Sequence, residues 1–353
     1  MKISLICSIA LVGLLLTFSN AASDRCYGLA LQGGGDKAAY QVGAIKGLIE
    51  NLESDEVQYD VITGVGIGAI NAAVLAAHPK GEEKEALDEL LDMWMNLKES
   101  DVYKGWSWGG PVRGLLFEES LYDSRPFRTF INANVKKPVR YYQVTATNAN
   151  TGAITTWNET TDLDTLQIAI DASAAYPGFF QPVVIGNTTY YDGGTSMSVN
   201  IGGAINQCKK LGYSEDKITI DVLLNSGATI KDKDTSTYTS IPMLIRYLEI
   251  RLYYDTMDLL ERAKQGFRTV QFRYAIAPTQ KLTPGVLPFS FNKKQIKKMM
   301  EVGYNDAVDA INLGSGVSVD DLIEYTDEKN AHEFDGDYHD FLENKYVLKK
   351  RVE

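Results

Sequence analysis

Short apolar segments that alternate with helical patterns constrain the fold of this chain more than any other feature of the sequence. Residues 27–31 and 218–224 are apolar runs of strand length, whereas residues 38–52 and 292–313 carry helical periodicity. Strands separated by helices in this way form a mostly parallel sheet that helices cover on both faces. Further strands are expected at residues 59–62, 139–147, 153–157, 183–185, 188–191 and 269–274, and further helices from after residue 68 to about 77 and at residues 85–97, 166–172 and 241–263. We therefore predict an α/β fold.

The two ends of the chain are expected to lie outside the folded domain. Residues 1–21 combine a positive residue, an apolar run and a small-x-small site, which is typical of a secretory signal peptide. Residues 315–353 are rich in acidic side chains, and we interpret them as a solvated or partly disordered tail. Residues 22–314 would then form one domain. The signal peptide predicts a secreted protein or one in a lysosome-like or vesicular lumen.

Charge and cysteine content narrow the choice of partners and compartment. A formal net charge of −11 argues against nucleic acid and against charge-driven binding to anionic membranes. An oxidising compartment permits a disulfide between Cys26 and Cys208, but two cysteines are not a framework, and the pairing stays open. Asn158 and Asn187 begin glycosylation sequons. Residues 335–337 do not match a calcium-binding loop, and we expect neither a metal nor a cofactor.

Two glycine-rich segments stand between a strand and a helix. Residues 33–37 read Gly-Gly-Gly-Asp-Lys, a loop whose backbone N–H groups can converge on an oxyanion or a phosphate; a plain glycine turn is the alternative. Residues 64–68 have the frame of a G-x-S-x-G nucleophile elbow, but the central residue is Gly66, which has no side chain to attack a carbonyl. A dinucleotide fingerprint also fits, yet the acidic residues that follow open a polar helix rather than close a strand.

A third segment supplies a carboxylate. Asp192 follows a short strand and precedes two glycines, so it can serve as a base, or it can simply form an Asp-Gly turn. His78 lies at a helix end, while His332 and His339 lie in the acidic tail. A Ser-His-Asp triad therefore has little support, whereas a serine–aspartate dyad needs no histidine.

In this order the segments resemble the patatin-like phospholipases, a family of lipid acyl hydrolases. Residues 172–182 are similar to the family's A-S-x-A-x-P-x-x-F-x-P segment, and residues 145–152 to its A-T-x-x-x-T-G region. The resemblance covers about residues 27–313 and implies a three-layer α/β/α sandwich related to the α/β-hydrolases. It also implies that Asp192 is the aspartate of a Ser-Asp dyad. By the same resemblance, the elbow frame is Gly64 and Gly68, and the oxyanion loop is Gly33, Gly34, Gly35 and Lys37.

The departures from the family pattern cluster on the site. Gly66 occupies the nucleophile position, Ala38 replaces a glycine, and residues 195–200 do not follow the family's continuation with asparagines and a proline. We expect a catalytically impaired homologue that can retain a lipid or acyl-ester ligand. One alternative is an active hydrolase whose Gly66 is an engineered substitution or whose nucleophile lies elsewhere. Another is a structural or assembly module with an unused pocket. Other hydroxyls that can lie near the motifs, none on the elbow turn, are those of Thr63, Ser173, Thr195, Ser196 and Ser198.

Two segments bear on peripheral membrane contact. Residues 106–117 carry aromatic and aliphatic side chains around a Gly-Gly-Pro turn, namely Trp106, Trp108, Leu115, Leu116 and Phe117. Such a loop can enter a lipid interface, or it can be a lid packed on the core, and the lid is our preferred interpretation. Charged residues interrupt the helix expected at residues 241–263, which we interpret as core and pocket wall.

Overall fold

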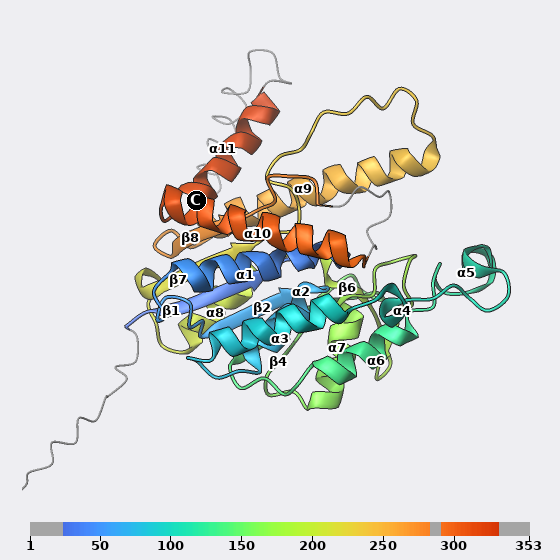
Figure 1. Ribbon diagram of the computed structural model, residues 1–353, viewed down its shortest axis with the longest axis horizontal. Helices are drawn as coiled ribbons and strands as arrows, with labels where there is room; N and C mark the ends of the chain where they lie inside the picture. Colours follow the sequence, from blue (N-terminus) through green and yellow to red (C-terminus); the bar gives the residue numbers. More distant parts are fainter. Residues whose placement is uncertain (1–23, 283–290, 332–353) are drawn as a thin grey trace, which may run out of the picture.

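A central sheet of eight strands organises the computed structural model, which describes residues 24–282 and 291–331 (Figure 1). The strand order is β5-β6-β3-β2-β1-β7-β8, and β4 pairs with β3 outside this path. Parallel pairs join β1 to β2 and β7, β2 to β3, and β7 to β8, whereas β4, β5 and β6 pair antiparallel. The strands are β1 (Cys26–Leu31), β2 (Val61–Val65), β3 (Tyr141–Asn148), β4 (Ile154–Asn158), β5 (Val183–Ile185), β6 (Thr188–Asp192), β7 (Ile218–Leu223) and β8 (Gln271–Ile276).

Burial along the strands explains why the sequence forms this sheet. Every residue of β2 and β7 is buried, as expected for central parallel strands that helices cover on both faces. In β4 exposed positions alternate with partly buried ones, which fits a strand that pairs only with β3. The mixed α/β architecture with a mostly parallel sheet confirms the predicted fold class.

Helices lie on both faces of the sheet and create three layers (Figure 1). The buried side chains accordingly form two large clusters, one on each side of the sheet. The first side carries α1 (Ala39–Asn51), α2 (Gly68–Ala76), α3 (Glu83–Asn96) and α10 (Lys293–Leu313), continued by α6 (Arg125–Asn134) and α7 (Leu163–Ser173). The second carries α8 (Ile201–Lys210), α9 (Ser240–Gly266) and α11 (Val317–Ala331). The short elements are α4 (Glu99–Val102), α5 (Gly110–Phe117), η1 (Gly35–Ala38), η2 (Gly193–Thr195) and η3 (Glu215–Lys217).

The helices α1 and α10 pack so closely that their backbones touch. A Cβ added to Gly43 would lie 1.9 Å from the carbonyl oxygen of Met300, and one added to Gly303 would lie 2.0 Å from that of Tyr40. Because neither site has room for a methyl group, glycine on both helices is required for this crossing. The Tyr40 hydroxyl also donates to Asp306 Oδ2 at 2.9 Å.

The acidic segment after residue 314 is not a solvated extension throughout, which corrects the prediction for its first part. Residues Val317–Ala331 form α11, whose Val319 and Leu322 are buried in the second cluster. The hydroxyls of Thr326 and Tyr253 lie 2.8 Å apart and tie α11 to α9. Apolar residues at helical spacing among the acidic ones form this buried stripe, so the folded domain continues through α11. Residues 332–353 and the predicted signal peptide, residues 1–21, lie outside the described part.

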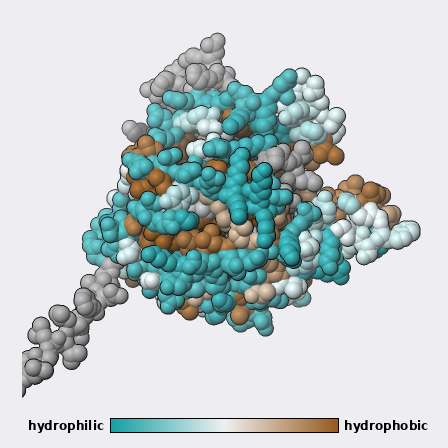
Figure 2. All heavy atoms as spheres, viewed as in Figure 1, coloured by the Kyte–Doolittle hydropathy of each residue, from teal (hydrophilic) through white to brown (hydrophobic). Residues whose placement is uncertain are grey.

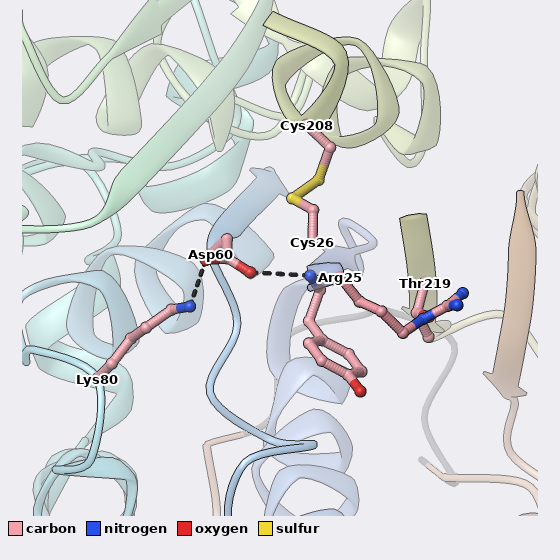
Figure 3. Close-up of a disulfide and its surroundings, with 7 residues drawn as sticks. Arg25, Cys26, Asp60, Lys80, Cys208 and Thr219 are labelled. Carbon is pink, nitrogen blue, oxygen red and sulfur yellow. Dashed lines mark hydrogen bonds and ion pairs between the residues drawn. A yellow bond between two sulfur atoms is a disulfide. The ribbon is translucent and has the colours of Figure 1, made fainter. Parts of the chain in front are cut away.

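A disulfide joins Cys26 in β1 to Cys208 in α8, so the pairing that the sequence left open is formed in the structure (Figure 3). Both cysteines are fully buried, and their Cα atoms are 5.8 Å apart. Next to the bond, the N–H of Tyr27 donates to Asp60 Oδ2 at 2.9 Å, and Lys80 pairs with the same carboxylate. The amino end of β1 is thereby fixed, while its other end leads into the glycine loop.

Candidate active site

The two glycine segments meet at the carboxyl edge of the sheet. β1 ends at Leu31 just before Gly33, and β2 ends at Val65 just before Gly66. Because β1 and β2 are parallel neighbours, both loops emerge at the same edge, where α/β folds bind their ligands. A Cβ added to Gly33 would lie 3.8 Å from the Cα of Gly66. The structure therefore brings these two predicted segments together.

Residues 64–68 form a tight strand-to-helix turn. Gly66 has a φ of +57°, a left-handed conformation that residues with a side chain adopt only with strain. The flanking glycines are required by packing: a Cβ on Gly64 would lie 2.4 Å from the Cα of Ala69, and one on Gly68 would lie 2.5 Å from the carbonyl oxygen of Gln32. The segment thus has the backbone of a nucleophile elbow.

Asp192, the last residue of β6, faces the elbow. A Cβ added to Gly66 would lie 3.3 Å from Asp192 Oδ1, so a hydroxyl one bond further out would be within hydrogen-bond reach. The N–H of Gly194 donates to Asp192 Oδ1 at 3.0 Å, and the Asp192 N–H donates to the carbonyl of Ala175 at 3.0 Å. These contacts fix the carboxylate beside Gly66.

Burial makes Asp192 more basic than an ordinary aspartate. Loss of solvent raises its pKa from 3.8 to about 6, although the hydrogen bond from Gly194 acts in the opposite direction. A carboxylate with a pKa of about 6 is largely ionised at neutral pH and can accept a proton from a hydroxyl or a water molecule. Asp192 therefore has the properties of a general base.

The glycine loop offers fewer N–H groups than the sequence predicts. The N–H of Gly33 donates to the carbonyl of Ser198 at 3.1 Å, and that of Lys37 donates to the carbonyl of Gly34 at 3.3 Å. The N–H groups of Gly34 and Gly35 form no hydrogen bond within the described residues. The predicted oxyanion loop therefore reduces to two available donors, since Gly33 holds the loop in place instead.

Lys37 adds positive charge to the same loop. Burial lowers the pKa of its ammonium group, while the carboxylates of Asp36 and Glu249 raise it. In the described part of the chain this ammonium forms no hydrogen bond and no ion pair. A lysine in the same loop as two N–H groups without hydrogen bonds favours the approach of an anionic or strongly polar group.

A buried polar network, which sequence reasoning missed, supports the loop from behind. The side-chain oxygen of Gln32 accepts from the N–H groups of Asn225 at 2.5 Å and Ser226 at 2.9 Å. Its amide nitrogen donates to the Thr256 hydroxyl at 2.7 Å, and Gln41 donates to the Gln32 carbonyl at 2.8 Å. A glutamine that ends an apolar strand directly before glycines was the only sequence signal for this role.

Ser173 supports the elbow rather than replacing the nucleophile. Its hydroxyl accepts the N–H of Gly66 at 2.8 Å and donates to the carbonyl of Thr145 at 2.5 Å, and its side chain is buried. Because the hydroxyl proton is committed to a carbonyl, it is not directed at Asp192. The A-S-x-A motif located this serine, but its contacts could not be inferred from the sequence.

The other hydroxyls are also engaged elsewhere or directed away. Thr63 donates to the carbonyl of Asn200 at 2.8 Å, Ser196 lies 3.0 Å from the Thr147 hydroxyl, and Ser198 lies 3.2 Å from the Thr256 hydroxyl. Thr195 is exposed. Within the described residues, no hydroxyl makes a hydrogen bond to the Asp192 side chain.

The lid prediction for residues 106–117 is wrong. Trp108 is 93% exposed, the side chains of Leu115 and Phe117 are exposed as well, and α5 projects from the body of the molecule (Figure 1). Only Gly114 of α5 is buried, and a Cβ there would lie 2.4 Å from the carbonyl oxygen of Leu121. The helix therefore docks through a glycine and turns its apolar side chains outward.

Two further observations concern possible modifications and metals. Asn158 and Asn187 are both exposed, as glycosylation acceptors must be. Among the described residues, no group of three or more histidine, cysteine or acidic side chains is placed to hold a metal ion.

The fold and this edge of the sheet define an α/β acyl-hydrolase scaffold: a glycine loop with open N–H groups, an elbow and a facing carboxylate. The model of the patatin-like phospholipase family matches residues 29–205, half of the chain. The protein belongs to the patatin-like phospholipase family.

Individual relatives are distant. Calcium-independent phospholipase A2-gamma of Rattus norvegicus is 25% identical over 240 residues, which cover 60% of this chain but only 30% of that protein. The chain thus spans less than a third of this curated relative. Among solved structures, VipD from Legionella pneumophila aligns with a TM-score of 0.40 and 12% identity, over 83% of this chain and 68% of that one.

Proposed function

We propose that this protein is a lipid-binding member of the patatin-like phospholipases that has kept the hydrolase scaffold and lost the nucleophile. One observation carries the proposal: a Cβ added to Gly66 would lie 3.3 Å from Asp192 Oδ1. A nucleophile would need to start from this position, and glycine provides no hydroxyl there. Asp192 and the elbow backbone lie around this position, and the Gly34 and Gly35 N–H groups are the oxyanion donors that the proposal assigns. Such a site can hold an acyl group without cleaving it.

The chemistry available to the site follows from its parts. An ester carbonyl can accept from the N–H groups of Gly34 and Gly35, with the Lys37 ammonium nearby. In an intact dyad, the serine oxygen would attack the carbonyl carbon while its proton moved to Asp192. Without that oxygen, no acyl-enzyme forms, and loss of a nucleophile lowers turnover by about 10⁶ in a well-studied serine hydrolase. Binding is the function that remains.

A secretory location belongs to the same proposal. The buried Cys26–Cys208 disulfide is of the kind that persists in oxidising compartments, and both glycosylation sequons are exposed. These observations support secretion or residence in a vesicular lumen, as the amino-terminal residues 1–21 predict.

An ester-hydrolysis assay on matched variants tests the loss of the nucleophile. We expect the parent protein, which has Gly66, and its Gly66→Ala variant to hydrolyse a soluble, short-chain p-nitrophenyl ester at the same low rate. Gly66→Ser should raise kcat/KM by about 100-fold or more, and Asp192→Asn in that variant should abolish the gain. Asp192-dependent hydrolysis by the protein with Gly66 would instead identify an active hydrolase with another nucleophile.

Ligand binding is tested separately. We expect a delipidated sample to bind a fatty acid or lysolipid in a native-mass titration, with weaker binding after Lys37→Ala. If no lipid binds at millimolar concentration, the scaffold serves as a structural or assembly module, and the proposal fails.

A further inference from the structure

Two apolar segments project from the same side of the molecule, beyond the sheet edge that carries the candidate site (Figures 1 and 2). We call them the α5 tip and the α9 tip. The exposed side chains of the α5 tip are Trp108, Val112, Leu115, Leu116 and Phe117. Those of the α9 tip are Ile241, Met243, Leu244 and Tyr247. Together they account for nine of the large apolar side chains that the described surface exposes.

The α9 tip exists because α9 is longer than the body that it covers. The helix has 27 residues, which corresponds to a length of about 40 Å. All of its buried residues, the first of which is Tyr253, belong to the carboxyl-terminal half. The amino-terminal half extends past the second layer (Figure 1), and four of its large apolar side chains, those of the α9 tip, are exposed.

The backbone of the α5 tip is strained in a way that exposes a tryptophan. Trp108 has a φ of 65°, the only positive value for a residue other than glycine in the described chain. Gly109 and Gly110, which follow it, also have positive φ values. Strain of this kind persists where the surroundings impose it and often marks a functional segment. Here it places a fully exposed indole at the end of a projection.

Hydrogen bonds connect the segments that follow the two tips to the site. Directly after α5, the N–H of Leu121 donates to the carbonyl of Gly178 at 2.9 Å, in the loop that follows Ala175, whose carbonyl holds Asp192. On the other side, Thr256 of α9 accepts the Gln32 amide that supports the glycine loop. Each tip is therefore continuous in sequence with a residue whose hydrogen bond supports part of the candidate site.

Charge indicates which lipid surface these tips fit. Arg113 pairs with Glu118 at 2.6 Å, and Glu249 pairs both with Arg246 at 3.1 Å and with Lys233, so ion pairs compensate part of the positive charge near the tips. A net charge of −11 also opposes an anionic surface. Aromatic and aliphatic side chains on separate projections suit the headgroup region of a bilayer, which adapts to their shape.

We propose that the α5 and α9 tips insert into a zwitterionic lipid surface and hold the candidate site against it. Tryptophan, tyrosine and phenylalanine at the tips would anchor the protein at the interface, without any need for anionic lipid. Binding of this kind requires neither turnover nor an acyl ligand in the site, and so it goes beyond the function proposed above.

Vesicle flotation tests this surface. We expect the purified protein to float with phosphatidylcholine vesicles, and the partition coefficient to fall by at least about tenfold in Trp108→Ala/Phe117→Ala. Ile241→Ser/Leu244→Ser should have a similar effect. Leu313→Ser, which removes another exposed apolar side chain at the far end of α10, is the control and should bind like the parent. A change from 0.1 to 0.5 M salt should alter binding by less than about twofold.

Several outcomes would overturn the proposal. These are failure of the parent to bind phosphatidylcholine vesicles, binding that needs anionic lipid or disappears in high salt, and unchanged binding by both tip variants. If the tip variants instead convert a dimer into monomers in sedimentation, the tips contact a second copy of the chain. Because Gly66→Ser is assayed on a soluble ester, loss of vesicle binding and failure of the proposed function remain distinguishable.

Discussion

Burial of the ionised Asp192 carboxylate costs free energy, and the contacts of this side chain in the fold do not offset that cost. Burial raises its pKa to about 6, and among the described residues its side chain accepts one hydrogen bond, from the Gly194 N–H. A raised pKa in a carboxylic acid means that the folded state disfavours the ionised form. A raised carboxylate pKa is common where the carboxylate must act as a base on a neighbouring hydroxyl. Here the neighbouring residue is Gly66, which has no hydroxyl.

This cost predicts how stability depends on pH. Because the folded protein holds the Asp192 proton more tightly than the unfolded chain, the free energy of unfolding should fall as pH rises from about 4 to about 6. Two pKa units correspond to about 2–3 kcal/mol. We expect Asp192→Asn to stabilise the protein by up to that amount at pH 7 and by much less at pH 4, in urea unfolding monitored by circular dichroism.

Asp55→Asn, at an exposed position, is the matched control and should change stability by similar small amounts at both pH values. If Asp192→Asn shifts the free energy of unfolding equally at pH 4 and pH 7, then burial of the charge is not the source of the effect.

Sequence reasoning located the residues of the site but not their hydrogen bonds. The motifs placed Gly66 and Asp192 in segments that the fold brings together, because parallel neighbouring strands end at one edge. The motifs could not show that the Gly33 N–H is occupied by Ser198, since that contact depends on a distant segment. The roles of Gln32 and Ser173 were missed for the same reason.

Among the elements, the crossing of α1 and α10 depends on glycines that pack backbone against backbone. A Cβ at position 43 would overlap the Met300 carbonyl, and the neighbour is main chain that cannot rotate away. We expect Gly43→Ala to lower the free energy of unfolding by about 2–4 kcal/mol, despite the higher helix propensity of alanine. Urea unfolding measures this change.

Gly202 provides the comparison for Gly43→Ala, since a Cβ added to this residue of α8 meets nothing within 4 Å. Gly202→Ala should be neutral or slightly stabilising, as helix propensity alone predicts. Equal effects of the two substitutions would mean that the helices can separate without loss, and that the close crossing contributes nothing.

Most strands and long helices followed from apolar periodicity, whereas the errors arose in segments where two signals compete. Acidic composition obscured the buried stripe of α11, because charge dominates the average composition while a few residues such as Val319 and Leu322 make the packing contacts. The apolar character of α5 suggested burial, but only Gly114 of this helix is buried. The apolar side chains of α5 instead form an exposed patch, which is typical of an interaction surface. Periodicity predicts which residues share a face, but not what covers that face.

At the scale of the whole molecule, the disulfide links the first strand of the sheet to a helix on its second face. The two cysteines are 182 residues apart in sequence, so the bond closes a long loop that includes both glycine segments and Asp192. In the chain-entropy account, a cross-link stabilises the fold by restricting the unfolded chain, and more so for longer loops. The candidate active site therefore lies within the stretch of chain that the Cys26–Cys208 disulfide closes into a loop.

We expect removal of this bond to lower the free energy of unfolding by several kcal/mol, up to about 5 kcal/mol. The measurement is guanidinium unfolding with and without a reducing agent, for the parent and for Cys26→Ala/Cys208→Ala. The parent should lose stability when it is unfolded and refolded under reducing conditions, whereas the double variant should be indifferent to the reductant. Since both sulfur atoms are buried, reduction should proceed only through unfolding and should be slow in the native state. A parent protein whose midpoint is unaffected by the reductant would show that the bond contributes nothing to stability, and would weaken the case for placing this protein in an oxidising compartment.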